Sequence, residues 1–212
     1  HLRVGAFLFG IEDPQSLFDV GLHFGTLIVV VAFFWRDVVK LAAAPFVTAA
    51  RLLRREPWAD ISADPGLRGA WFVILGSIPT GALGILLGPH LEGAAVSLHF
   101  VAIMFLVNSL VLFGSRYLVL PLGAARMNTG FRGMRWHDAV VIGIAQGLSV
   151  ARGISRSGST ISAALVLGVD RETAGRYSFL LSIPAILGAT LVSTRTFAVP
   201  DNFDWTACAV GV

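Results

Sequence analysis

Charged residues are scarce in this sequence, and cysteine and lysine are almost absent. Only 14% of its 212 residues are charged, against about 25% in typical soluble domains. The single cysteine, Cys208, excludes an intramolecular disulfide framework and a cysteine-based metal site. The net charge of +3 is small and spread along the chain, which argues against nucleic acid as a partner. With 55% hydrophobic residues and a mean hydropathy of +0.76, the composition predicts a membrane protein.

Neither end of the chain resembles the end of a complete membrane protein. Residues 1–10 contain no charged region followed by a long apolar core, so we expect no signal peptide. The chain begins with His1 instead of Met, and a new apolar run starts shortly before Val212. We therefore expect an internal fragment, in which an N-terminal re-entrant segment and the C-terminal helices are incomplete.

Four apolar runs are long enough to cross a bilayer as helices, which takes about 20 residues. They cover residues 17–35, 70–88, 98–118 and 177–197. Two further runs, 138–150 and 160–169, are too short, since 13 residues of helix span only about 20 Å of a hydrocarbon core about 30 Å thick. Two half-length runs joined by a polar stretch predict a re-entrant hairpin, whose irregular backbone is buried or lines a cavity. A single kinked crossing and a pair of surface helices remain alternatives.

Basic residues alternate between the connections that join these runs. Segments 36–69 and 119–137 each carry several arginines, whereas segment 89–97 carries no Lys or Arg. The positive-inside rule places the two basic segments on the cytoplasmic side. The hairpin 138–169 would then enter and leave the membrane from that side.

The two ends of the chain show a weak internal similarity. Residues 1–10 (HLRVGAFLFG) match residues 159–168 (STISAALVLG) in their small, apolar and glycine positions, although chance similarity between apolar helices is an alternative. The predicted topology gives the two segments opposite orientations, as in the inverted repeats that build sites near the membrane midplane. We therefore predict an all-α polytopic membrane protein with inverted repeats and re-entrant helical hairpins. Residues 1–212 form a single transmembrane domain, with 1–35 the remnant of a first repeat and 138–197 the second.

The polar stretch SVARGISRSGST, residues 149–160, joins the two short runs. A charged Arg at bilayer depth costs about 2.5–3.5 kcal/mol on insertion scales, so Arg156 is expected to be paired or functional. Gly153 and Gly158 allow sharp turns and a close approach to a ligand. Ser159 or Thr160 is suited to cap the following helix, whose N-terminal N–H groups favour an anion. Since a guanidinium matches phosphate oxygens, we expect a phosphate or diphosphate cradle; a carboxylate site and a purely structural cap are the alternatives.

Residues 143–189 (GIAQGLSVARGISRSGSTISAALVLGVDRETAGRYSFLLSIPAILGA) closely resemble the second signature region of the undecaprenyl-diphosphate phosphatase (bacitracin-resistance) family. The resemblance extends to residues 18–37 (FDVGLHFGTLIVVVAFFWRD) and 76–87 (GSIPTGALGILL). It implies a helical fold with inverted repeats and two re-entrant hairpins. It also implies hydrolysis of the diphosphate of a C55 polyprenyl carrier at the outer face of the bacterial inner membrane, which recycles the carrier for cell-wall synthesis.

The resemblance assigns roles to individual residues of the loop and of the N-terminus. Ser155, Arg156 and Thr160 match the hydroxyl–Arg–hydroxyl phosphate site of the family, and His1 matches the last polar position of its first signature. Asn108, a polar residue inside the run 98–118, is a weaker site candidate, because it could equally serve as a helix–helix contact. The predicted catalytic residues are His1, Arg156 and Ser155; the phosphate-binding residues are Ser157, Gly158, Ser159, Thr160 and Arg152; the site-shaping residues are Gln146 and Gly153.

The chain departs from the family pattern at two points. The two glutamates and the Ser-Ser pair of the first signature should precede His1, so they are absent from residues 1–212. The resemblance associates those acids with a divalent metal, Mg or Ca, so we expect no metal ligands in this chain and no activity from residues 1–212 alone. Arg152 stands where the family usually has Pro. It would either hold a second phosphate or an interfacial lipid phosphate, or repel Arg156.

The expected chemistry is phosphoryl transfer to water, directly or through a covalent phospho-enzyme. Arg156, the hydroxyls and the helix terminus would stabilise the charge on the phosphoryl group. Either His1 or a serine would be the nucleophile. The rival function is a transporter of polyprenyl phosphate or another anion, which shares the fold but needs no acid–base set. The expected partners are the polyprenyl diphosphate and membrane lipids, with a homodimer left open.

Overall fold

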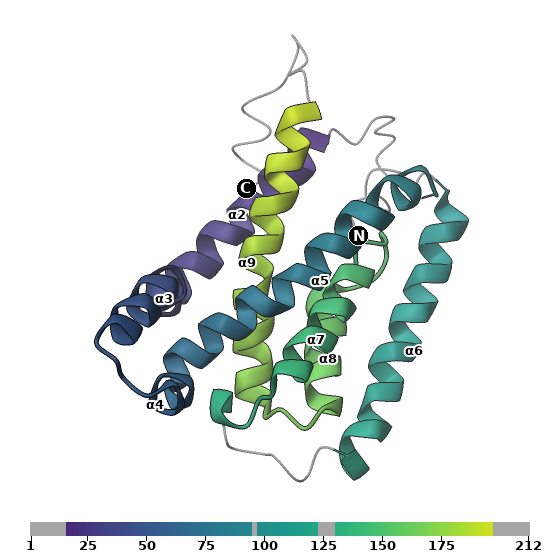
Figure 1. Ribbon diagram of the computed structural model, residues 1–212. Helices are drawn as coiled ribbons and strands as arrows, with labels where there is room; N and C mark the ends of the chain where they lie inside the picture. Colours follow the sequence, from purple (N-terminus) through teal and green to yellow (C-terminus); the bar gives the residue numbers. More distant parts are fainter. Residues whose placement is uncertain (1–15, 95–96, 123–129, 197–212) are drawn as a thin grey trace. The chain divides into compact units, whose positions relative to one another are not determined.

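The structure is a computed structural model that describes residues 16–94, 97–122 and 130–196. Over these residues it is helical and contains no strand, which confirms the predicted all-α class. The elements in chain order are α2 Ser16–Phe33, α3 Trp35–Leu53, α4 Trp58–Ala63, α5 Pro65–Ala94, α6 Leu98–Leu122, the short 3₁₀ turn η2 Gly130–Arg132, α7 Trp136–Leu148, α8 Arg156–Val166 and α9 Arg171–Thr196 (Figure 1).

Three of the described helices are long and apolar enough to cross a membrane. These are the segments Pro65–Leu91, Leu98–Leu118 and Arg171–Leu191, and they confirm the runs predicted at 70–88, 98–118 and 177–197. The run 17–35 forms α2, which ends at Phe33, two residues early; α3 begins directly afterwards at Trp35. Because part of its side chains lie outside the described residues, a crossing by α2 stays a prediction. The chain is a multi-pass membrane protein.

The chain divides into two compact units, each described by itself: residues 36–182, and residues 1–35 together with 183–212. In the second unit, Leu27 and Val30 are buried on α2, and Ile183 and Ile186 are buried on α9. The first fifteen residues lie outside the described part of the chain. The pairing of two inverted repeats therefore stays a prediction.

The core of unit 36–182 depends on a close approach of α5 and α7. A Cβ atom added to Gly143 would overlap the carbonyl oxygen of Gly76 and lie 2.9 Å from its Cα atom. The hydroxyl of Thr80 lies 2.9 Å from the carbonyl oxygen of Gly143, across the same contact. Tyr177 of α9 is fully buried and donates to the carbonyl oxygen of Phe72 at 2.7 Å. Glycine thus brings two backbones together, and α9 closes the core beside them.

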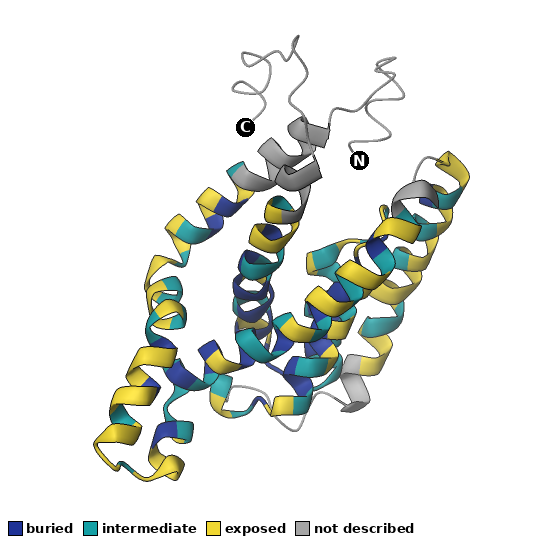
Figure 2. Ribbon diagram, turned by 45° about the horizontal axis from the view of Figure 1, so that its top comes forward, coloured by how far each residue is buried: buried dark blue, intermediate teal, exposed yellow. Residues whose placement is uncertain are grey.

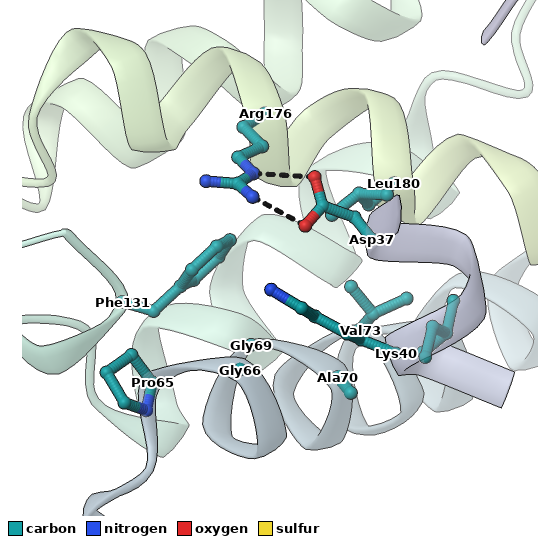
Figure 3. Close-up of a pocket in the computed structure, with 11 residues that line it drawn as sticks. Asp37, Lys40, Pro65, Gly66, Gly69, Ala70, Val73, Phe131, Arg176 and Leu180 are labelled. Carbon is teal, nitrogen blue, oxygen red and sulfur yellow. Dashed lines mark hydrogen bonds and ion pairs between the residues drawn. The ribbon is translucent and has the colours of Figure 1, made fainter. Parts of the chain in front are cut away.

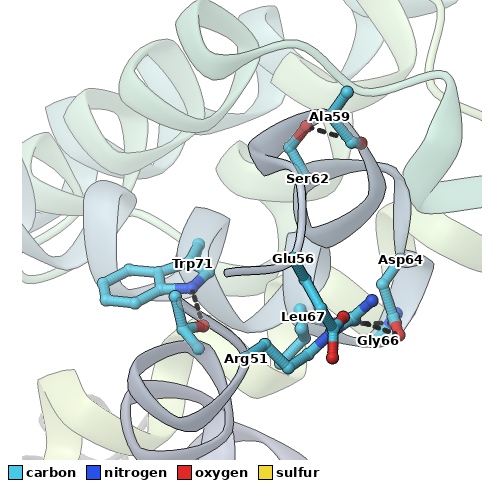
Figure 4. Close-up of polar contacts among 9 residues, drawn as sticks. Arg51, Glu56, Ala59, Ser62, Asp64, Gly66, Leu67 and Trp71 are labelled. Atoms are coloured by element: carbon cyan, nitrogen blue, oxygen red, sulfur yellow. Dashed lines mark hydrogen bonds and ion pairs between the residues drawn. The ribbon is translucent and has the colours of Figure 1, made fainter. Parts of the chain in front are cut away.

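Segment 36–69, read from the sequence only as a basic connection, contains the helices α3 and α4. Ala44, Ile61, Leu67 and Ala70 form a small buried cluster between α3, α4 and the start of α5. Polar contacts reinforce the cluster: Trp71 Nε1 donates to Thr48 Oγ1 at 3.0 Å, and Arg51 lies 2.6 Å from Glu56 and 3.5 Å from Asp64 (Figure 4).

The outer face of α3 carries exposed apolar residues, among them Phe46 and Leu53, and exposed residues cover much of this helix (Figure 2). Its inner face buries Ala44 and Thr48. An amphipathic helix of this kind, rich in basic residues, is typical of a membrane interface and not of a crossing segment.

The two short runs form the predicted hairpin, with α7 and α8 side by side (Figure 1). Helix α7 has 13 residues and α8 has 11, so each arm is about 15–20 Å long and shorter than a hydrocarbon core. The two arms fold back on each other, which excludes a single kinked crossing. The turn between them occupies residues 149–155.

Candidate active site

The hairpin turn is shaped by Gly153 and by helix α6. Gly153 has a φ of +107°, a backbone conformation that glycine adopts without strain. A Cβ at this position would lie 2.8 Å from Met104 Cβ and 2.9 Å from the carbonyl oxygen of Val101. Glycine is therefore required both by the backbone angle and by the contact with α6. The predicted role of Gly153 in shaping a phosphate site stays a prediction.

Helix α8 begins at Arg156 and is capped by Ser155. The Oγ of Ser155 accepts a hydrogen bond from the backbone N–H of Gly158 at 3.1 Å. The cap predicted at Ser159 or Thr160 is wrong, because both lie inside the first turns of α8. As a result Arg156, Ser157 and Gly158 form the first turn, where the helix dipole and free N–H groups favour an anion.

Asn108 of α6 holds the turn in place. Its Oδ1 accepts a hydrogen bond from the backbone N–H of Ser155 at 2.9 Å. The side chain therefore fixes the residue that caps α8 and precedes Arg156. The sequence offered a helix–helix contact for Asn108, and the structure shows a contact with the turn instead. A polar residue in the middle of an apolar run was the available signal.

Arg156 and its neighbours form the polar surface of the turn. The guanidinium of Arg156 is partly buried, while Ser155 and Ser157 on either side are exposed. Among ion pairs between described residues, none involves Arg156. A partly desolvated cation beside exposed hydroxyls and a helix N-terminus can bind an oxyanion, because each group donates hydrogen bonds or positive charge.

Thr160 and Ser159 point into the protein. Thr160 is fully buried, and its hydroxyl lies 3.0 Å from the carbonyl oxygen of Arg156 and 2.5 Å from the hydroxyl of Ser178 on α9. Ser159 is also buried. In this arrangement Thr160 ties the first turn of α8 to α9. A direct contact of either hydroxyl with phosphate stays a prediction.

The remaining predicted site residues are placed as follows. Gln146 is buried and its Nε2 donates to the carbonyl oxygen of Leu181 at 3.0 Å, so it anchors α7 to α9 just before the turn. The hydroxyl of Ser149 donates to the carbonyl oxygen of Gln146 at 2.6 Å. Arg152 is exposed on the turn. His1 lies outside the described residues.

The loop does not offer the ligand set of a divalent metal. Its polar groups are guanidinium and hydroxyl groups, whereas Mg²⁺ and Ca²⁺ prefer carboxylate oxygens. Within residues 16–94, 97–122 and 130–196, no three His, Cys, Asp or Glu side chains come together as a metal site would require. The described residues therefore do not fit a divalent metal.

Comparison with known proteins places the whole chain beside one family. The family model of the bacitracin resistance protein BacA matches residues 1–212. An undecaprenyl-diphosphatase from Methanosphaera stadtmanae is 40% identical over 210 residues, which cover 95% of this chain and 71% of that protein. Proteins of the same name are 39% identical in Desulforapulum autotrophicum, over 96% of this chain and 72% of the relative, and 39% identical in Thermomicrobium roseum, over 92% and 68%.

Proposed function

The chain belongs to the bacitracin resistance protein BacA family, and from this premise we propose that it is an integral-membrane phosphatase acting on undecaprenyl diphosphate. It would release phosphate and leave undecaprenyl phosphate, which recycles the lipid carrier of cell-wall synthesis. The observation that carries the proposal is the similarity, at 39–40% identity along more than nine tenths of the chain, to proteins named undecaprenyl-diphosphatase. The oxyanion geometry of the hairpin turn supports the same function.

Arg156 would bind the terminal phosphoryl group. Its planar guanidinium matches two phosphate oxygens at once, and the first N–H groups of α8 face the same end of the helix. During transfer, negative charge spreads over the phosphoryl oxygens, so preorganised donors lower the barrier without rearranging. The bond from phosphorus to the bridging oxygen breaks, undecaprenyl phosphate leaves, and a water oxygen ends on the released phosphate.

Ser155 is better placed as a donor than as a nucleophile. Its Oγ already accepts the N–H of Gly158, while its own O–H proton is free to be donated to a phosphate oxygen. Among the hydrogen bonds between described residues, none joins Ser155 to an acid or a base that could remove this proton. His1, the other candidate, remains our proposed nucleophile or general acid–base, since imidazole titrates near neutral pH.

Substitution of Arg156 tests the assignment. Phosphate release from undecaprenyl diphosphate by the full-length protein should fall about 100-fold or more in Arg156→Lys, since loss of one oxyanion donor costs about 10²–10³ in kcat. Lys keeps the charge but not the planar fork. Arg54→Lys, an exposed change at the end of α3, is the matched control and should keep full activity. Full activity in Arg156→Lys would contradict the assignment, and substrate binding without turnover in the wild type would favour a carrier.

Four further features belong to the proposal. We place the enzyme in the bacterial inner membrane with the hairpin turn facing the extracytoplasmic side, which accessibility of a cysteine introduced at Ser157 to a membrane-impermeant thiol reagent would test. A divalent metal, Mg or Ca, is proposed from the family resemblance; EDTA should then stop turnover and added metal should restore it. Homodimerisation is tested by light scattering of the purified protein in detergent.

A further inference from the structure

A polar cavity lies in unit 36–182, away from the hairpin turn. It is bordered by α3, the first turns of α5, the turn η2 and the first turns of α9, and its volume is about 140 Å³ (Figure 3). In Figure 1 the starts of α5, α7 and α9 lie at the opposite end of α7 from the residue 149–155 turn. The cavity is therefore separated from the candidate active site by about the length of α7, roughly 20 Å.

Small residues of α5 leave the space for this cavity. Gly66, Gly69 and Ala70 line it on one side. The ring of Phe131 packs on the bare backbone of Gly69, where an added Cβ would meet the ring at 3.1 Å. Gly66 is approached by the stem of Lys40, whose Cδ would lie 3.7 Å from a Cβ at that position. The floor of the cavity is thus backbone and its walls are Phe131 and the Lys40 stem.

Two cations border the cavity from different helices. Arg176 of α9 is held by two hydrogen bonds to the carboxylate of Asp37, one of them 2.8 Å from Nε to Oδ2. Its guanidinium carbon lies 5.8 Å from the ring centroid of Phe131. The guanidinium of Arg176 is therefore fixed in position, while its remaining N–H groups are not used by Asp37. The ammonium group of Lys40 points into the cavity from α3 (Figure 3).

The charges of the cavity do not cancel. Lys40 and Arg176 contribute two positive charges, and Asp37 contributes one negative charge. Among the salt bridges between described residues, none involves Lys40. The adjoining cavity is bordered by two acids, Asp170 and Glu172, and by Arg132, and the carboxylate of Asp170 accepts hydrogen bonds from the backbone N–H groups of Gly130 and Thr173. Among the residues that line the cavity itself, two cations thus face one acid, and Asp37 is paired with Arg176.

The position of the cavity relative to the spans indicates the source of an anion. The membrane-spanning segments of α5 and α9 begin at Pro65 and Arg171, and the cavity lies within the first turns of both helices. That is the depth of lipid headgroups, where basic residues meet anionic lipid. We propose that this cavity binds a phosphate group, supplied by an anionic glycerophospholipid whose chains lie along the apolar outer surface of the helices.

Lys40 provides the test because it is exposed and lies far from the hairpin turn. Thermal unfolding of the full-length protein in a neutral detergent is measured against increasing dihexanoyl-phosphatidylglycerol, dihexanoyl-phosphatidylcholine and inorganic phosphate. A ligand that binds the folded state raises the midpoint according to its dissociation constant. We expect a saturable rise with phosphatidylglycerol that Lys40→Arg retains and Lys40→Gln shifts to about tenfold higher concentration. Arg54→Gln, which removes the same charge just after the end of α3, should leave it unchanged.

Each outcome decides the proposal. If inorganic phosphate raises the unfolding midpoint as much as phosphatidylglycerol does, and the rise depends on Lys40, the site is supported and free phosphate is its source. Equal weakening by Lys40→Gln and Arg54→Gln means unspecific charge attraction and overturns the proposal, as does the absence of a saturable rise with any of the three probes. Hydrolysis of undecaprenyl diphosphate should be unchanged in Lys40→Gln. A failure here is therefore distinguishable from a failure of the proposed enzymatic function.

Discussion

Replacement of Gly143 by Ala should destabilise the protein by separating α7 from α5. The added Cβ would overlap the backbone of Gly76, and backbone atoms cannot rotate away as a side chain can. Such overpacking costs about 1–3 kcal/mol. Loss of the hydrogen bond between Thr80 and the carbonyl oxygen of Gly143 adds about 0.5–1.5 kcal/mol. The better helix propensity of Ala returns about 1 kcal/mol, which leaves a net loss of about 0.5–3.5 kcal/mol.

Thermal unfolding in detergent, followed by circular dichroism, measures this loss. For a chain of this size, about 1 kcal/mol corresponds to about 2–4 °C in the midpoint, so Gly143→Ala should melt about 1–14 °C below the wild type. Gly84→Ala on α5 and Gly175→Ala on α9 are matched controls, because an added Cβ meets no atom within 4 Å at either position. They should melt at or slightly above the wild-type temperature. If Gly143→Ala melts as high as these controls, the close contact of the two backbones is refuted.

Three further predictions concern the turn and the start of α9. Asn108→Ala removes the acceptor of the Ser155 N–H and should lower kcat about tenfold, equivalent to about 1.4 kcal/mol, with little change in KM. Asn108→Asp keeps the acceptor and should restore part of the rate. An unchanged kcat in Asn108→Ala would rule out the positioning role. Burial opposes ionisation of Asp170, but hydrogen bonds from Thr173 and from a neighbouring backbone N–H outweigh it and lower its pKa. The contribution of ionised Asp170 to folding stability is therefore complete above its ordinary pKa of about 3.9 and is lost as the pH falls through the lower folded-state pKa. Asp170→Ala should unfold more easily than the wild type at pH 7 and should lose this acid dependence. A pH profile of stability equal to that of the wild type would contradict the assignment. Arg152→Gln should raise KM for the diphosphate several-fold without changing kcat if this exposed side chain holds a second phosphate, and unchanged kinetics would exclude that role.

The sequence was sufficient to predict the elements whose signal is local. Long apolar runs predicted three helices, which the structure places at Pro65–Leu91, Leu98–Leu118 and Arg171–Leu191. This signal is local because a helix that crosses the bilayer needs about 20 consecutive apolar residues, whatever helices pack beside it. Two shorter runs around a polar stretch likewise predicted a hairpin. The amphipathic helix α3 was missed because its charges made segment 36–69 resemble a loop. The spacing of Leu41, Ala44 and Thr48, three and then four residues apart, was the sequence signal that could have found it.

The start of α8 could not be predicted from the sequence. Ser155, Ser157, Ser159 and Thr160 can all cap a helix, and the local sequence does not rank them. Asn108, 47 positions away along the chain, accepts the N–H of Ser155 and fixes the cap there. The same choice puts Arg156 on the first turn of the helix and turns Thr160 inward toward Ser178.

By itself, then, the sequence determined that this is an all-α membrane protein with an arginine-bearing hairpin, since hydropathy, glycine content and motif are properties of the chain alone. The tertiary structure decided which hydroxyls face outward and which support the loop. It also decided that Lys40 and Arg176, 136 positions apart in the numbering, border one cavity. The physical reason is the same in both cases. Hydrogen bonds and packing between α3, α5, α6 and α9 select one arrangement among several that the local sequence permits equally.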